Sequence, residues 1–204
     1  MELDPELQRR LIRTVAERVI AHTDELVALD RAIGDGDHGL NMKRGFEAVL
    51  ADLDKFAAMP LGEALKGVGM ALVMKVGGAS GPLYGSLFMA LGKALPEQAG
   101  RAGLAQAFAA AVEAVKARGK SDVGQKTMID VLVPALAVLQ DTAVDLPVRL
   151  CSAAQQAATA TIPVRALRGR ASFLGERSVG HMDPGARSAS LMICAVMDVM
   201  EGRA

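Results

Sequence analysis

The sequence predicts an all-α protein, and three observations support that prediction. Aromatic residues make up only 3% of the 204 residues, while Ala, Leu, Met, Glu, Gln, Lys and Arg dominate, which is a helix-forming composition. Apolar residues recur three and four positions apart through most of the chain, as in amphipathic helices. No alternating run of useful length indicates a β-strand. We expect about eight or nine helices in a single domain that spans residues 1–204.

The predicted helices follow one another, with Gly or Pro at most of the joins. The first begins after Asp4 as its cap, with Pro5 in the first turn. A short second helix begins at Thr23 and runs into Asp30, and a third runs from Asn41 to about Phe56. The remaining helices are expected near 61–76, 81–95, 102–118, 126–141, 145–160 and 185–200.

The composition excludes several classes of protein. The 23 basic and 23 acidic residues balance, so no overall basic field draws the chain to nucleic acid or to a membrane. No apolar run approaches about eighteen residues, and the acidic N-terminus lacks a signal peptide's apolar run. We therefore expect a soluble cytoplasmic protein. Cys151 and Cys194 are expected to be small buried apolar side chains rather than a disulfide framework.

Three aspartates, Asp30, Asp35 and Asp37, lie within eight residues where the second helix gives way to the third. At an effective dielectric constant of about 20, two like charges about 4 Å apart cost about 4 kcal/mol, so a folded cluster favours a bound cation. The glycines around them permit backbone bends that bring the carboxylates to one point. Carboxylate oxygens suit Mg²⁺, and a charge of −3 is enough for two such ions bridged by phosphate oxygens.

Four familiar local motifs fit this part of the chain less well than a metal site does. Asx turns and helix capping account for one or two of the aspartates, but not for all three. Gly34–Gly39 matches the dinucleotide pattern G-x-G-x-x-G, but no strand precedes it, and its aspartates would repel a pyrophosphate. An EF-hand fails because Gly39 and Phe46 occupy loop positions five and twelve. Gly119–Ser121 resembles the end of a P-loop, but Ala114 replaces the glycine that the motif requires.

Two elements next to this cluster could contact a phosphate. The start of the third helix offers backbone amides to an anion. His38 is there either a structural side chain, a phosphate contact or a hydrogen-bond partner of Asp37. In the turn Val76–Pro82, small residues allow close approach of a ligand, and Ser80 can either donate to phosphate or cap the following helix.

A long segment near the C-terminus breaks the helical pattern. Residues 163–185 are rich in glycine and arginine, and they are expected to form a binding loop without helical periodicity. Arg170 in this loop suits bidentate phosphate binding, with a solvated surface arginine as the alternative. Asp183 and Pro184 would cap and begin the last helix, which places another helix N-terminus near the site.

In combination, these residues resemble the ADP-binding L subunit of bacterial dihydroxyacetone kinase. The matching segments, in order, are Leu29–Met42, Gly77–Leu83, Arg118–Lys120 with Gly124–Met128, Gly169–Ser178 and Gly180–Gly185. The resemblance extends from about residue 5 to the end of the chain. It implies a closed antiparallel barrel of about eight amphipathic helices, with the nucleotide bound at one end.

The resemblance also implies a set of site residues. Asp30, Asp35 and Asp37 would hold two Mg²⁺ ions that bridge the phosphates of ADP or ATP. The nucleotide-binding positions that it implies are His38, Gly39, Leu40, Asn41, Ala79, Ser80, Gly119, Met128, Arg170, Asp183, Pro184 and Gly185. His38 and Arg170 are candidate phosphate stabilisers, and no residue is assigned a certain catalytic role. Met182 stands where close relatives are expected to have Gln.

The activity that the resemblance implies is a phosphoryl transfer in which ADP stays bound as a coenzyme. A phosphohistidine on an M subunit would phosphorylate the ADP, and the phosphoryl group would pass to dihydroxyacetone on a K subunit. Two alternatives stay open. One is an L-type subunit of an ATP-dependent kinase for another small ketose or polyol. The other is a protein that binds a transcription regulator according to its nucleotide state. The oligomeric state, including a homodimer, also stays open.

Overall fold

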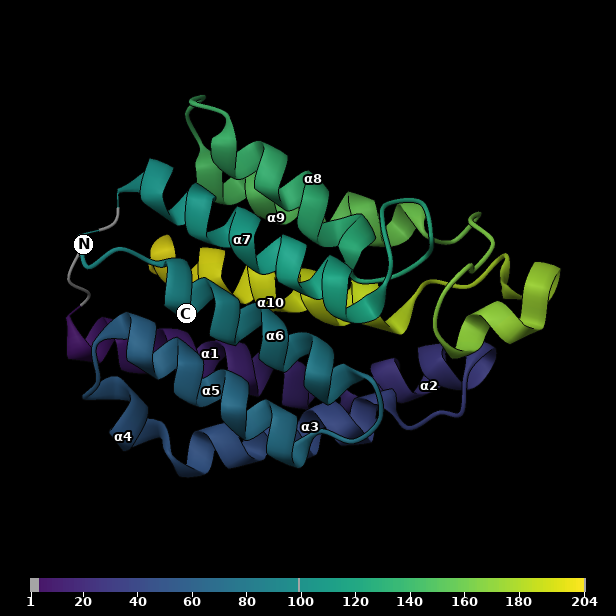
Figure 1. Cartoon of the computed structure of the whole chain (residues 1–204), viewed down its shortest axis with the longest axis horizontal. Coiled ribbons are helices and arrows are strands. Elements are labelled where there is room, and N and C mark those ends of the chain that lie inside the picture. Colours follow the sequence, from purple (N-terminus) through teal and green to yellow (C-terminus); the bar gives the residue numbers. More distant parts are fainter. Residues whose placement is uncertain (1–3, 99, 204) are drawn as a thin grey trace.

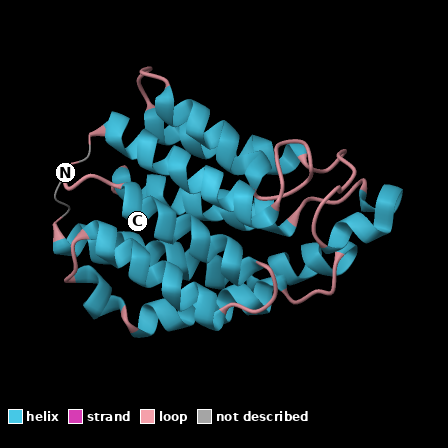
Figure 2. Cartoon of the chain, viewed as in Figure 1, coloured by secondary structure: helices cyan, strands magenta, loops and turns pink. Residues whose placement is uncertain are grey.

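The computed structural model of the chain describes residues 4–98 and 100–203. These residues form helices and no β-strand, which confirms the all-α prediction (Figures 1 and 2). The elements are α1 (Pro5–Ala21), α2 (Thr23–Ile33), α3 (His38–Ala51), α4 (Leu53–Ala57), α5 (Leu61–Lys75), α6 (Ser80–Ala94), α7 (Arg101–Gly119), α8 (Ile129–Gln140), α9 (Leu146–Ala160), the 3₁₀ helix η1 (Arg170–Ser178) and α10 (Pro184–Met200). Within these ranges, no helix combines the length and apolar character needed to cross a membrane.

The predicted third helix is wrong at both ends. It begins at His38 rather than Asn41, and it is divided at Asp52, whose backbone leaves the helical region with φ −103° and ψ 16°. The following short helix α4 buries Phe56, and the Gln8 side chain donates hydrogen bonds to the Phe56 and Met59 carbonyls, which fixes the end of α4 against α1. Hydrophobic periodicity continues through this break, so the pattern alone does not reveal it.

The other boundary differences lie around the predicted site. Helix α2 continues past Asp30 to Ile33, because Ile33 packs in a small buried cluster with Ala166 and Ala171. The long segment near the C-terminus contains η1, although the sequence predicts no helical element there. The 3₁₀ helix is interrupted at Gly175, whose φ of 57° lies in the left-handed region, so it carries no helical hydrophobic pattern that the sequence could display.

Eight of the helices pack in a cyclic order of neighbours. Along this cycle α1 contacts α3, followed by α5, α6, α7, α8, α9 and α10, and α10 contacts α1 again. The apolar core lies between them and includes Met42, Phe46, Leu72 and Ile129. Helix α10 contacts α1, α2, α8 and α9, and more of its residues are buried than exposed. This order supports the expected closed bundle, whose barrel form stays a prediction.

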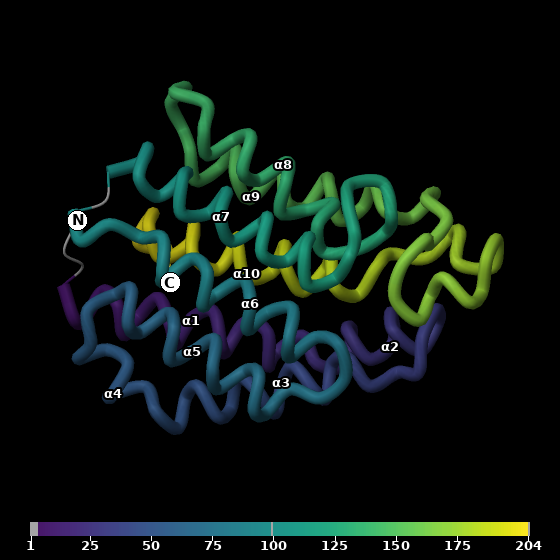
Figure 3. The backbone as a smooth tube through the Cα atoms, in the orientation of Figure 1, coloured from purple at the N-terminus to yellow at the C-terminus, as the bar shows by residue number. Residues whose placement is uncertain are grey.

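Several of the turns between helices gather at one end of the bundle. Figure 3 shows the α2–α3, α5–α6 and α7–α8 connections and the segment before α10 at the right-hand end of the tube. Hydrogen bonds join these turns across long sequence separations, for example between His38 and Ser80 and from Lys126 to the carbonyl oxygen of Thr161. Glycine-rich segments that are far apart in the sequence therefore meet at this end.

The prediction for the cysteines is wrong in two respects. Cys194 is buried, as expected, but Cys151 is only partly buried, and the two residues form a disulfide. The pairing arises because α9 and α10 pack side by side and bring the two Cα atoms to 4.7 Å. A separation of 43 residues in the sequence gives no indication of this contact.

Helices α5 and α6 approach closely enough that glycine is required between them. A Cβ atom at Gly92 would lie 2.4 Å from the Gly62 carbonyl oxygen. Alanine improves helix propensity by about 1 kcal/mol, but overpacking against an immovable backbone costs about 1–3 kcal/mol. We therefore expect Gly92→Ala to lower the free energy of unfolding by up to about 2 kcal/mol in urea titrations. Lys93→Ala, one residue away and exposed, should change it by less than about 0.5 kcal/mol. A more stable Gly92→Ala protein would contradict the close approach of the two helices.

Candidate functional site

The turn between α2 and α3 brings the three predicted aspartates together. Asp30 is buried in the last turns of α2, while Asp35 and Asp37 are exposed in the connection. One carboxylate oxygen from each residue lies within 4.8 Å of the other two. Three carboxylate oxygens are the donor set that a hard divalent cation such as Mg²⁺ prefers. The residues therefore fit the predicted ion, and their role as ligands stays a prediction.

Glycine and one hydrogen bond shape this turn. A Cβ atom at Gly34 would lie 2.3 Å from Oδ1 of Asp30, so only glycine lets that carboxylate lie across the turn. The backbone N–H of His38 donates to Oδ2 of Asp30 over 3.0 Å, which satisfies one free amide at the start of α3. Asp37 precedes α3 as its N-cap residue, but its side chain makes no capping hydrogen bond. Capping therefore accounts for Asp30 and not for all three carboxylates.

Arg170 brings a positive charge to the acidic turn. Its guanidinium lies 3.0 Å from Oδ2 of Asp35, and its side chain is 67% exposed. Arg170 is therefore exposed, as the alternative of a surface arginine expects, but it lies beside the carboxylate cluster. An exposed ion pair of this kind adds little stability, so the guanidinium can leave Asp35 for a phosphate at small cost.

The first turn of α3 lies against the turn between α5 and α6. Asn41 is buried, and a Cβ atom at Gly77 would lie 2.7 Å from its Oδ1. Gly39 is also buried, whereas the Leu40 side chain is 55% exposed. Ala79 precedes α6 as its N-cap residue and Ser80 is the first residue of that helix. The contact between Asn41 and Gly77 therefore places the start of α3 beside the turn that leads into α6.

The side chains of Ser80 and His38 form a contact that the sequence does not predict. Ser80 makes no helix cap, so the capping alternative is wrong. Its Oγ lies instead 2.9 Å from Nδ1 of His38, and Nε2 of His38 lies 3.0 Å from Oγ of Ser188. The imidazole is therefore directed at two serines, not at Asp37. Burial lowers the pKa of His38 to about 4, so the ring is neutral near pH 7.

The lowered pKa of His38 predicts how the stability of the fold changes with pH. Its pKa falls from 6.5 to about 4 on folding because of burial, so between these values the unfolded chain binds the proton and the folded chain does not. Stability therefore rises with pH in this window. The wild-type free energy of unfolding minus that of His38→Gln should grow by on the order of 3 kcal/mol from pH 4 to 6.5 and then level off. Urea titrations across this range measure it, and a pH-independent difference would contradict the burial of a neutral ring.

The start of α10 completes this end of the bundle. Asp183 caps the helix by accepting a hydrogen bond from the Ala186 amide over 2.7 Å, and Pro184 is the first residue, as predicted. Burial raises the pKa of Asp183 to about 7. Met128 is the buried N-cap residue of α8, and its amide lies 3.6 Å from where a Cβ of Gly185 would be. These predicted nucleotide positions therefore lie next to each other.

Gly119 lies slightly apart from that pair. It is the last residue of α7, and a Cβ atom there would lie 3.2 Å from Leu83 of α6. It is thereby placed beside the helix that begins with Ser80. No contact joins it directly to the aspartates in the part of the chain that the structure describes.

The sequence does not predict the role of Lys126. Its side chain is only 1% exposed, and Nζ donates hydrogen bonds to the carbonyl oxygens of Thr161 at 2.6 Å, Val164 at 3.1 Å and His181. Burial lowers the pKa of its ammonium group. Lys126 thus joins the loop before α8 to both ends of the segment before α10. In the sequence, only the family resemblance draws attention to the segment Gly124–Met128 that contains Lys126. No pattern of residue spacing indicates that a lysine is buried and bound to carbonyl oxygens.

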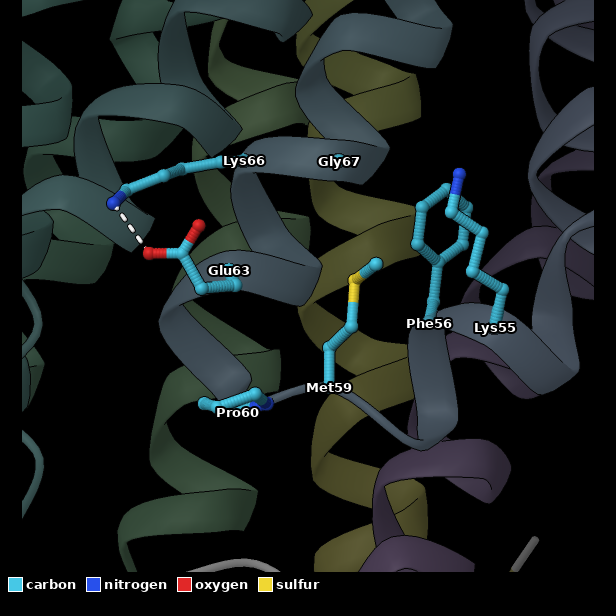
Figure 4. A pocket seen from close by; sticks show the side chains of 7 residues that line it. All are labelled: Lys55, Phe56, Met59, Pro60, Glu63, Lys66 and Gly67. Atoms are coloured by element: carbon cyan, nitrogen blue, oxygen red, sulfur yellow. Dashed lines mark hydrogen bonds and ion pairs between the residues drawn. The ribbon is translucent and has the colours of Figure 1, made fainter.

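Two surface cavities lie away from this end. The larger, with a volume of about 470 Å³, is lined by residues of α4 and α5 and the turn between them (Figure 4). The other, of about 380 Å³, lies between α7 and α8 near Arg101 and Leu139. Neither is lined by any predicted site residue. The candidate site is therefore defined by the converging turns and helix N-termini, not by these hollows.

The fold and the site define an all-helical protein with a carboxylate cluster and several helix N-termini at one end, an arrangement suited to a cation and an anionic ligand. The model of the DAK2 domain matches residues 32–198. The chain belongs to this family, which confirms the resemblance drawn from its motifs.

The relatives include subunits of nearly the same length. The chain is 42% identical over 198 residues to the ADP-binding subunit of PEP-dependent dihydroxyacetone kinase 1 from Listeria innocua, covering 97% of this chain and 98% of that protein. It is 44% identical over 179 residues to the corresponding Escherichia coli subunit, covering 84% and 85%. The C. freundii dihydroxyacetone kinase in complex with AMP-PNP and Mg²⁺ is 27% identical with a TM-score of 0.75, covering 97% of this chain and 34% of that one.

Proposed function

We propose that this protein is the ADP-binding subunit of a dihydroxyacetone kinase, a phosphotransferase that acts on an alcohol group. Bound Mg–ADP would serve as a coenzyme that receives a phosphoryl group from a phosphohistidine donor subunit and passes it to dihydroxyacetone on a separate subunit. The observation that carries this proposal is the near full-length match to ADP-binding subunits of PEP-dependent kinases. The clustering of Asp30, Asp35 and Asp37 provides the chemistry that such a subunit needs.

Each turn at this end has a proposed task. Asp30, Asp35 and Asp37 would hold two Mg²⁺ ions, which when bound neutralise phosphate charge. The amides at the starts of α3 and α6 would face the phosphates. Arg170 would exchange its contact with Asp35 for one with a phosphate oxygen, since guanidinium suits such groups.

The remaining predicted contacts surround the rest of the nucleotide. We propose that Gly119, Met128 and Asp183–Gly185 contact it beyond the phosphates. The adjacency of Met128 and Gly185 supports this assignment. The single-domain organisation, the cytoplasmic location and the K-type and M-type partner subunits are further parts of the proposal.

Reconstitution tests the proposed function. The purified protein, loaded with Mg–ADP, would be combined with a dihydroxyacetone-binding subunit and dihydroxyacetone, and supplied with either a phosphohistidine donor protein or free ATP. We expect sustained turnover with the phosphohistidine donor and little turnover with ATP. Turnover with ATP alone, together with rapid exchange of the bound nucleotide, would instead identify an ATP-dependent kinase subunit. No transfer in either arm would overturn the proposal and leave nucleotide-dependent binding of a regulator as the alternative.

A further inference from the structure

A buried polar network connects the candidate site to the interior of the bundle. It consists of His38 from α3, Ser80 and Tyr84 from α6, and Ser188 from α10. Tyr84 is 1% exposed and Ser188 is 0% exposed. Oγ of Ser188 lies 3.0 Å from Nε2 of His38. Oη of Tyr84 lies 2.7 Å from the same Oγ.

The contacts of Ser188 determine where its single hydroxyl hydrogen lies. Its Oγ lies 3.0 Å from the Pro184 carbonyl oxygen and 3.1 Å from the Gly185 carbonyl oxygen. Carbonyl oxygens can only accept. Oη of Tyr84 is a third possible acceptor, and it can itself donate to the Gly185 carbonyl oxygen 3.1 Å away. Ser188 must therefore donate to one of these three oxygens, or its own oxygen would lie beside them with no hydrogen between, which is unfavourable in a buried site.

The position of the Ser188 hydroxyl hydrogen determines which ring nitrogen of His38 carries a hydrogen. If Ser188 donates to a carbonyl or to Oη of Tyr84, it can only accept from Nε2, so the neutral ring carries its hydrogen on Nε2. Nδ1 is then an acceptor, and the hydrogen between Nδ1 and Ser80 must come from Ser80. The opposite tautomer would take the Ser188 hydrogen for Nε2. A doubly protonated ring would be a buried cation whose two nitrogens contact hydroxyl groups rather than carboxylates.

We propose that His38 is a positioning residue, held as its Nε2–H tautomer by Ser188, that draws the Ser80 hydroxyl hydrogen inward. Ser80 then presents only oxygen lone pairs to the nucleotide side, so it serves a cation or an N–H group and does not donate to phosphate. The phosphate donors at this turn are backbone amides. This inference deepens the proposed function and rests on it for the identity of the nucleotide. The assignment of hydrogens rests on the network alone.

Nitrogen-15 NMR of the imidazole rings tests the tautomer directly. A ring nitrogen that carries hydrogen has a shift distinct from one that does not, and the His22→Gln and His181→Gln variants assign the three histidines. We expect His38 in the full-length wild-type protein to be protonated on Nε2 and unprotonated on Nδ1. This pattern should be present without nucleotide and with Mg–ADP. A wild-type ring with hydrogen on Nδ1, or on both nitrogens, would overturn the proposal.

A matched pair of serine variants tests the positioning role. Ser188→Ala removes the acceptor of Nε2, so the hydrogen should move to Nδ1 and Mg–ADP should dissociate about 10-fold more readily. Ser190→Ala is the control, because Ser190 is on the same helix, is equally buried and bonds only to the Arg187 carbonyl. It should leave both the His38 spectrum and ADP affinity unchanged. Tyr84→Phe keeps the acceptor and should keep the Nε2–H tautomer.

The outcomes separate this inference from the proposed function. If Ser188→Ala matches Ser190→Ala in spectrum and in affinity, the positioning role is wrong. If Ser188→Ala does not fold, the wild-type spectrum still decides the tautomer, and loss of the Nε2 hydrogen in Tyr84→Phe would contradict Ser188 as its acceptor. A wild-type protein that never takes up Mg–ADP would overturn the proposed function. The spectrum of the nucleotide-free protein would still confirm or contradict the Nε2–H tautomer.

Discussion

Asp35→Ala is expected to abolish the retention of Mg–ADP. Asp35 contributes one of the three carboxylate oxygens that lie within 4.8 Å of one another, so its loss would remove a proposed direct ligand and one unit of negative charge. Because even outer partners of metal sites change affinity by about 10–100-fold, we expect a loss of at least about 100-fold. The measurement is the amount of ADP released on denaturation after purification in Mg²⁺.

An aspartate outside the cluster provides the control for this experiment. Asp24→Ala also removes an exposed carboxylate, but Asp24 lies in the first turn of α2, at the other end of that helix from Asp30 and the connection that holds Asp35. It should retain ADP like the wild type. Normal retention by Asp35→Ala would show that the assignment of the metal ligands is wrong.

Lys126→Met should lower the stability of the fold. The substitution keeps the length of the side chain but leaves the carbonyl oxygens of Thr161, Val164 and His181 without their ammonium donor. The Thr161 carbonyl keeps the Val164 amide as a donor, and the Val164 and His181 carbonyls are partly buried. The cost for each lost donor therefore lies near the lower end of about 1–3 kcal/mol, and the relief of burying a charge offsets part of it. We expect the free energy of unfolding to fall by about 2 kcal/mol in urea titrations, with weaker ADP binding, because Asp183–Gly185 follow the released loop.

The matched control for this lysine is Lys120. Lys126 and Lys120 share a left-handed backbone, with φ of 62° and 48°, but Lys120 is exposed. Lys120→Met therefore removes the same charge from the same conformation without exposing buried carbonyls, and it should change stability by less than about 0.5 kcal/mol. Equal losses in the two variants would mean that the carbonyl contacts of Lys126 do not stabilise the loops.

Local chemistry explains which features could be predicted from the sequence. Helix positions follow from periodic apolar residues and from caps such as Asp183 followed by Pro184, which the structure confirms. The convergence of the three aspartates could be predicted because they lie within eight residues, where the glycines permit the backbone bends that bring them together. These signals depend on neighbours in the chain, which a sequence displays directly.

The features that the sequence does not reveal depend on contacts between distant segments. The disulfide joins residues 43 positions apart, and the bonds between His38 and Ser188 cross 150 positions. Tyr84 and Ser188 lie in ordinary helical patterns, and their polar atoms become significant only when α3, α6 and α10 pack together. The helix break at Asp52 is hidden for the same reason, because α4 is held by contacts from α1.

The central claim is that the aspartate turn holds the nucleotide through Mg²⁺, and the affinity of the wild-type protein for ADP with and without the ion tests it most directly. Calorimetric titration of ADP into nucleotide-free protein should give one ADP per chain in Mg²⁺. In excess EDTA the affinity should fall by at least about 100-fold, because the phosphates would then face three carboxylates without a cation between them. Equal affinity in the two conditions would contradict the claim.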